Sequence, residues 1–155
     1  MNINRISVYL DEMNLPFLEK EETSMVYENV GYNEPEQIYN ILCQGKYHRR
    51  ATENVCMLLM DGANHIISLC ELSKGSVNRS LVTNREVCQT ALLGGAVGVV
   101  LTHNHPSGDP TPSDMDIAVT EQIKNALEVV GVKLLDHIIL GMNSYVSMME
   151  QGILK

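Results

Sequence analysis

The chain has 155 residues, of which 45% are hydrophobic and 19% charged, and its formal net charge is −8. This length suffices for one domain with a buried core, and the composition is ordinary for a globular protein. The acidic balance argues against a broad surface for the phosphates of duplex nucleic acid, because such surfaces are basic. Four widely spaced cysteines without a C-x-x-C pair argue against a zinc ribbon or a disulfide framework.

No targeting or membrane segment is apparent. The N-terminal residues lack the basic segment followed by an apolar one that defines a signal peptide. The longest apolar stretch, Ala96 to Leu101, is too short to span a bilayer. We therefore expect a cytoplasmic protein without a membrane partner, and the sequence does not indicate its oligomeric state.

The first half of the chain predicts a helix followed by a hairpin of two strands. Residues 1–32 have no clear pattern, although RISVYLD alternates as a strand does. Pro35 at an early helical position predicts a helix that covers EQIYNIL. The apolar segments NVCMLLM and HIISLCEL flank the turn Asp61 to Asn64, an arrangement typical of a hairpin.

The second half alternates helices and strands. After a stretch rich in Ser, Gly and Asn, NREVCQTALL has helical spacing, with Asn84 as a suitable N-cap. AVGVVL predicts a buried strand, and DIAVTEQIKNALEVVG predicts a helix that ends at Gly131. VKLLDHIILG and YVSMM add two strands. The pattern predicts an α/β domain over residues 33–155, a mixed sheet with helices on both faces, preceded by an N-terminal extension over residues 1–32.

The stretch THNHPSGDPTPSDMD, residues 102–116, follows the buried strand directly and holds two of the five histidines. Ser113 and Asp116 have the spacing of a capping box, which explains them without any chemistry. That explanation does not extend to His103 and His105. These two residues are two positions apart at the end of a strand, so their imidazoles project from the same face of the sheet.

This stretch could hold an anion, or form a nuclease, deaminase or hydrolytic zinc site. Residues 106–108 precede a helix and could hold an anion, but no G-K-[ST] follows, and GGAVG lies on the wrong side of the strand. The letters HNH do not indicate an HNH nuclease, whose named residues are dispersed over a hairpin and a helix. A deaminase site would need H-x-E with P-C-x-x-C.

A hydrolytic zinc site needs three protein ligands and an open position for water, whose pKa falls to about 7. His103, His105 and Asp116 meet that requirement.

The spacing H-x-H, seven residues, Ser, two residues, Asp resembles the JAMM (MPN+/JAB) metalloprotease motif. HNHPSG, NREVCQTAL, LLDHIIL and YVSMMEQGILK resemble its RadC-like branch more closely, over roughly Glu34 to the C-terminus. The resemblance implies a JAB/MPN fold with cytidine-deaminase-like architecture. It also implies a zinc-dependent hydrolase that cleaves a peptide or isopeptide bond in a peptide or protein substrate.

The resemblance further implies a role for each motif residue. His103, His105 and Asp116 would bind Zn2+, and Ser113 would help to stabilise the tetrahedral intermediate. An upstream glutamate would act as general base and acid.

Three glutamates could be this base. Glu71 lies late in a hairpin strand, and Glu86 lies in a first helical turn, where a carboxylate is favoured by the helix dipole. Glu53 comes just before the strand NVCMLLM, which matches the placement in the family. We predict that Glu53 is the base.

The other histidines and Asn104 are expected to have structural or surface positions and no catalytic role. Asn104 faces away from the histidines and is expected to serve the fold. His137 is interpreted as a satisfied core histidine, with a contact to a metal ligand as the alternative. His48 and His65 are expected at the surface.

Two rival functions remain. One is a binding or scaffold module that keeps the metal for stability or recognition, and the other is an accessory role in DNA repair or processing. RadC proteins usually carry an N-terminal helix-hairpin-helix module, for which residues 1–32 lack the length and the glycine pattern. Direct nucleic-acid binding is therefore not expected.

Overall fold

The computed structural model describes residues 2–21, 25–28, 31–74 and 82–155. Its strands are β1 (Arg5–Leu10), β2 (Pro16–Glu21), β3 (Asn54–Met60), β4 (Ile66–Lys74), β5 (Gly98–Asn104), β6 (Lys133–Leu140) and β7 (Tyr145–Ser147). Its helices are α1 (Pro35–Gln44), α2 (Asn84–Leu93) and α3 (Asp114–Val129), with a single 3-10 turn, η1 (Tyr47–Arg49), in the described ranges.

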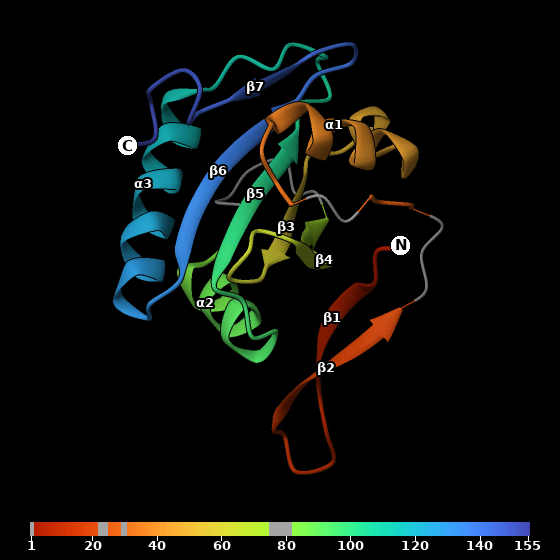
Figure 1. Cartoon of the computed structure of the whole chain (residues 1–155), viewed down its shortest axis with the longest axis vertical. Coiled ribbons are helices and arrows are strands. Elements are labelled where there is room, and N and C mark those ends of the chain that lie inside the picture. Colours follow the sequence, from red (N-terminus) through yellow and green to blue (C-terminus); the bar gives the residue numbers. More distant parts are fainter. Residues whose placement is uncertain (1, 22–24, 29–30, 75–81) are drawn as a thin grey trace.

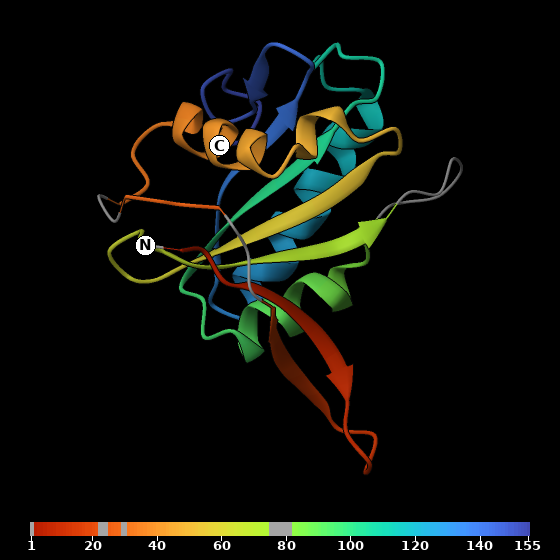
Figure 2. The same cartoon turned by 90° about the vertical axis from the view of Figure 1, so that its right-hand side faces the viewer.

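The strands form one mixed sheet in the order β2-β1-β4-β3-β5-β6-β7. Helix α1 covers one face, and α2 and α3 cover the other (Figures 1 and 2). Strands β3 and β5 are antiparallel neighbours at the centre, whereas β5 and β6 are parallel. The predicted α/β fold with helices on both faces is confirmed.

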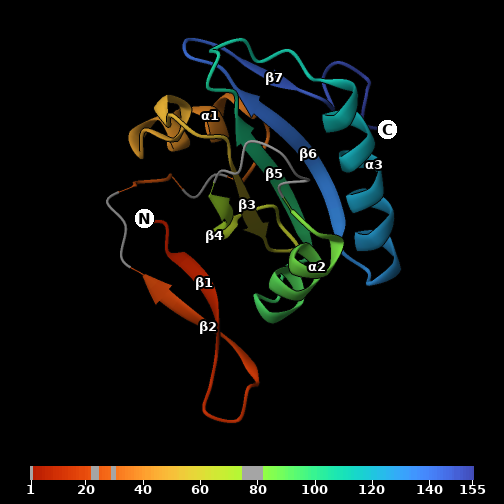
Figure 3. The same ribbon diagram turned by 180° about the vertical axis from the view of Figure 1, so that it is seen from behind.

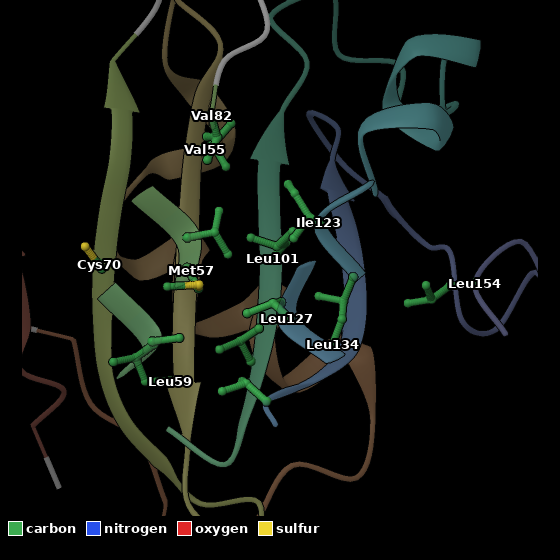
Figure 4. Packing of buried hydrophobic residues seen from close by; sticks show 14 of the residues in the cluster. Val55, Met57, Leu59, Cys70, Val82, Leu101, Ile123, Leu127, Leu134 and Leu154 are labelled. Carbon is green, nitrogen blue, oxygen red and sulfur yellow. The ribbon is translucent and has the colours of Figure 1, made fainter. Parts of the chain in front are cut away.

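Strands β3 and β5 carry the core because every residue in them is buried. Such strands need not alternate with polar residues, since both of their faces are covered. Met57, Leu101 and Leu127 belong to the cluster between the sheet and helices α2 and α3 (Figure 4). Leu58 points to the other face and packs in the cluster that includes Ile38 of α1. The site described below thus lies at the ends of the two fully buried strands of the sheet.

Helix α2 begins at Asn84, one residue earlier than the predicted cap at that position implies. Thr83, not Asn84, is the N-cap: its hydroxyl accepts from the Glu86 N–H at 3.2 Å, and the Glu86 carboxylate accepts from the Thr83 N–H at 3.0 Å. Thr83 has the extended backbone that this capping box requires, and Asn84 is already helical. The predicted cap Ser113 of α3 is confirmed.

The N-terminal residues form a hairpin. Strands β1 and β2 are antiparallel, and β1 pairs in parallel with β4, so the hairpin joins the sheet at one edge. Its turn extends away from the rest of the molecule (Figures 2 and 3). Residues 1–32 and residues 33–155 therefore contribute strands to the same sheet. The division of the chain at residue 32 stays a prediction.

Three further expectations concern single features. The four cysteines, all within the described ranges, are free. None of the helices in the described ranges has the length and apolar character needed to cross a membrane. The stretch rich in Ser, Gly and Asn lies for the most part outside the described residues, at 75–81.

Candidate metal centre

The candidate site lies where the end of β5 meets the start of β3 and of α3. Val55 pairs with His103 in the antiparallel ladder, so Glu53, just ahead of β3, lies beside the histidines that end β5. The first turn of α3 brings Asp116 to the same place. Glu53, His103, His105 and Asp116 each offer one ligand atom, and these atoms all lie within 4.8 Å of one another.

The separations of three of these groups fit a tetrahedral ion. A carboxylate oxygen of Asp116 lies 3.3 Å from His103 Nε2, and the other lies 3.4 Å from His105 Nε2. Bonds of about 2.0–2.1 Å to a tetrahedral zinc ion place neighbouring ligand atoms about 3.3 Å apart. The two Nε2 atoms are closer, at 2.9 Å. The ligand atoms are therefore spaced for a small cation, within a few tenths of an ångström.

The hydrogen-bond partner of His105 indicates its tautomer. His105 Nδ1 lies 2.8 Å from the main-chain oxygen of Asp109. A carbonyl oxygen can only accept, so Nδ1 carries the hydrogen. In the neutral ring, His105 Nε2 then has a free lone pair that points into the site.

A chain of hydrogen bonds indicates the same tautomer for His103. The Thr120 hydroxyl donates to the main-chain oxygen of Asp116 at 2.6 Å and therefore accepts from His137 Nδ1 at 2.5 Å. The remaining nitrogen of neutral His137, Nε2, accepts from His103 Nδ1 at 2.8 Å. His103 Nε2 is thereby left with a lone pair directed at the same point as that of His105.

Two lone pairs that face each other at 2.9 Å repel unless a positive charge lies between them. A metal ion or a proton can supply this charge, and the carboxylate of Asp116 lies beside the same position. The residues present thus fit a divalent metal with two imidazole ligands and one carboxylate ligand.

The pKa values reflect this crowding. Hydrogen bonding to Asp116 raises the pKa of His105, against the opposing effect of burial. Burial would raise the pKa of Asp116, but hydrogen bonds and charge from His103 and His105 hold it well below its ordinary range. Burial lowers the pKa of His137 well below its ordinary value, which keeps that ring neutral as the hydrogen-bond chain requires.

Ser113 lies beside the site as the N-cap of α3. Its hydroxyl donates to Asp116 Oδ2 at 2.7 Å and accepts from the Asp116 N–H at 3.1 Å. The side chain is exposed, so it lies at the open side of the ligand cluster. These bonds orient Asp116, whereas the predicted role of Ser113 toward a reacting oxygen stays a prediction.

The structure brings only one of the three candidate glutamates to the histidines. Glu53 Oε1 lies 3.7 Å from His103 Nε2, and its side chain is 33% exposed. Glu71 is paired with Arg50 and its side chain is buried, and Glu86 is held in the capping box of α2. The position of Glu53 agrees with the prediction, and its role as the base is still to be measured.

Some residues near the site depart from the sequence-based interpretation. His137 is buried as expected, but it contacts the ligand His103, which was the less favoured alternative. Thr120, which orients His137, was not singled out. The prediction that His48 lies at the surface is wrong, because His48 is only 9% exposed. His65, for which the same was predicted, is half-buried. The one sequence signal for His137 was a histidine within an apolar strand.

Comparisons with known proteins identify the family of the chain. Residues 32–153 match the family described as the RadC-like JAB domain. A UPF0758 protein of Pelobacter propionicus is 49% identical over 102 residues, which cover 66% of this chain and 44% of the relative. UPF0758 proteins of Geobacter sulfurreducens and Carboxydothermus hydrogenoformans are 39% and 41% identical over 79% and 82% of this chain, and 53% and 58% of their own lengths. The chain thus spans about half the length of the curated relatives it matches. With its candidate metal centre, the chain belongs to the RadC-like JAB domain family.

Proposed function

We propose that this protein is a zinc-dependent hydrolase that cleaves an amide bond, peptide or isopeptide, in a peptide or protein substrate. The observation that carries the proposal is the position of Glu53. Its carboxylate lies beside the three-ligand set of His103, His105 and Asp116 without being needed to complete it. A metal site with a purely structural role would not need a further, partly exposed carboxylate beside its ligands.

Zinc is the metal that this ligand chemistry favours, since two neutral imidazoles and one carboxylate are typical of hydrolytic zinc sites. When bound, the ion would supply Lewis acidity that activates water and polarises the substrate carbonyl. His103 and His105 present fixed lone pairs to it, because His137 and the Asp109 carbonyl hold their other ring nitrogens.

The protein groups would then handle the protons. Glu53 would take a proton from the attacking water while the water oxygen bonds to the carbonyl carbon. It would then deliver this proton to the amine nitrogen as the C–N bond breaks. We propose that the exposed Ser113 hydroxyl donates to the oxygen of the tetrahedral intermediate. For this donation Ser113 would give up its bond to Asp116 Oδ2, and the ion would replace that hydrogen as the partner of the carboxylate.

The test is Glu53→Gln, which keeps the size of the side chain and removes the base. Wild-type and variant protein are loaded with zinc and incubated with a proteome-derived peptide mixture, and new termini are counted by mass spectrometry. We expect zinc-dependent cleavage by wild-type protein, a loss of about 10²–10⁴-fold in the variant, and unchanged zinc content.

Glu86→Gln is the matched control. It makes the same chemical change at a glutamate that belongs to the capping box of α2 and not to the ligand cluster. It should keep turnover. Cleavage by Glu53→Gln at the wild-type rate would refute the assignment of the base. Stoichiometric zinc without any cleavage in the wild type would instead favour the scaffold module.

The remaining partner assignments belong to the same proposal. We propose that the protein is cytoplasmic. We also propose that it does not bind nucleic acid directly, because its net charge is −8. Binding to duplex DNA with a steep salt dependence would contradict this and favour an accessory role in DNA repair.

A further inference from the structure

Asn104 is the last residue of β5 and lies between His103 and His105 in the sequence, and its side chain bonds to the segment that carries Glu53. It is 2% exposed. Its Oδ1 accepts from the Asn54 N–H at 2.9 Å, and its Nδ2 donates to the carbonyls of Thr52 at 3.0 Å and Arg50 at 3.2 Å. All three bonds are to main-chain atoms around Glu53.

These bonds continue the sheet beyond its last regular pair. Val55 pairs with His103 in the β3–β5 ladder, and the ladder has no pair for Glu53. The carboxamide of Asn104 offers an acceptor and two donors, as main-chain peptide groups do. It bonds to Asn54 on one side of Glu53 and to Thr52 on the other, so it fixes the backbone from which the Glu53 side chain projects.

Alternation along β5 explains why the residue between two ligands can do this. Successive side chains of a strand point to opposite faces, so His103 and His105 face the site while Asn104 reaches toward residues 50–54. Asparagine is the residue that fits this position. Aspartate lacks both donors, and a carboxylate would face two carbonyl oxygens. An aliphatic residue would leave the Asn54 N–H and the Thr52 carbonyl without this partner.

We infer that Asn104 is a positioning residue that holds the Glu53 carboxylate in place beside the metal ligands. It touches neither a ligand atom nor the reacting atoms in the proposed mechanism. Its effect on turnover rests on the proposed function, whereas its effect on the backbone around Glu53 can be measured without any substrate.

The test uses the full chain with Asn104→Ala, and with Asn104→Leu as an apolar variant of similar size should the alanine protein fold poorly. Thr90→Ala is the control, since Thr90 is equally buried in the core face of α2, away from the site. The first measurement is hydrogen exchange at the Asn54 amide. We expect roughly tenfold faster exchange in the Asn104 variants, equivalent to about 1.4 kcal/mol, and no change in Thr90→Ala.

The second measurement is zinc affinity by competition with a chelator, and it separates Glu53 from the ligands. We expect a change of less than about threefold, because His103, His105 and Asp116 keep their own partners. The third is turnover, where a displaced base should lower kcat by roughly 10- to 100-fold with little change in KM. In the Glu53→Gln background, Asn104→Ala should add less than about threefold, because it acts through Glu53.

Unchanged exchange at Asn54 would overturn the inference, and so would independent, multiplying effects of the two substitutions. A loss of zinc in Asn104→Ala would also overturn it, by showing that Asn104 supports the ligands instead. Should no cleavage be found even in wild-type protein, the proposed function would fail while the exchange and zinc measurements still decide the role of Asn104.

Discussion

The hydrogen-bond chain behind His103 gives a sharp prediction for His137→Leu. The substitution places an apolar side chain of similar size at a position that is 5% exposed, and it removes the acceptor for His103 Nδ1. The buried N–H would lose its partner, at a cost of about 1–3 kcal/mol. His103 can escape this cost by moving its hydrogen to Nε2 or by turning its ring, and either change removes the lone pair that a metal needs.

Zinc affinity should therefore fall although no ligand has been changed. Partners of metal-bound histidines typically contribute about 10- to 100-fold in affinity, which corresponds to about 1.4–2.8 kcal/mol. Competition with a chromophoric chelator at neutral pH measures this directly. Thr120→Val should shift affinity in the same direction but less, because it removes only the group that orients His137.

His65→Leu is the matched control, since it removes a histidine that pairs with Asp61 on the β3–β4 turn and has no part in the site. It should bind zinc as the wild type does. A zinc affinity of His137→Leu within about threefold of wild type, with cooperative unfolding preserved, would show that His103 does not depend on this chain for its orientation.

Two further predictions concern pH and packing. Zinc and a proton compete for His105, whose pKa is raised by Asp116, so apparent zinc affinity should fall by up to about tenfold per pH unit below that pKa. The raised pKa also means that metal-free protein gains stability from the protonated pair at low pH and loses it as pH rises through that pKa; thermal unfolding with and without zinc from about pH 5.5 to 8 tests both signs. Gly141→Ala would place a Cβ 2.5 Å from the main-chain oxygen of Gly108, next to the Asp109 carbonyl that holds His105, so we expect about 1–3 kcal/mol of destabilisation and weaker zinc binding. Gly62→Ala, where a Cβ meets nothing within 4 Å, should leave both unfolding and zinc titration unchanged.

The sequence by itself determined the elements whose signals are local. The buried strands NVCMLLM and AVGVVL and the helix after Ser113 follow from apolar patterning and capping, and the structure has all three. His103, His105 and Asp116 could be grouped for the same reason, since a strand end and the next helix start lie within a few residues of each other. The hairpin of residues 5–21 was visible only in part, because β2 alternates poorly and depends on pairing with β1.

Only the tertiary structure decided how distant residues complete this group. The resemblance favoured Glu53 over Glu71 and Glu86, but that Glu53 lies beside the histidines follows from the β3–β5 register, while Glu71 is held by Arg50 and Glu86 by a helix cap. His137 lies 34 residues from His103 and meets it because β5 and β6 run in parallel as neighbours. Asn104, adjacent in sequence to two ligands, acts on a segment 50 residues away. Local patterns encode which face a side chain takes, whereas sheet register and packing determine what it meets there.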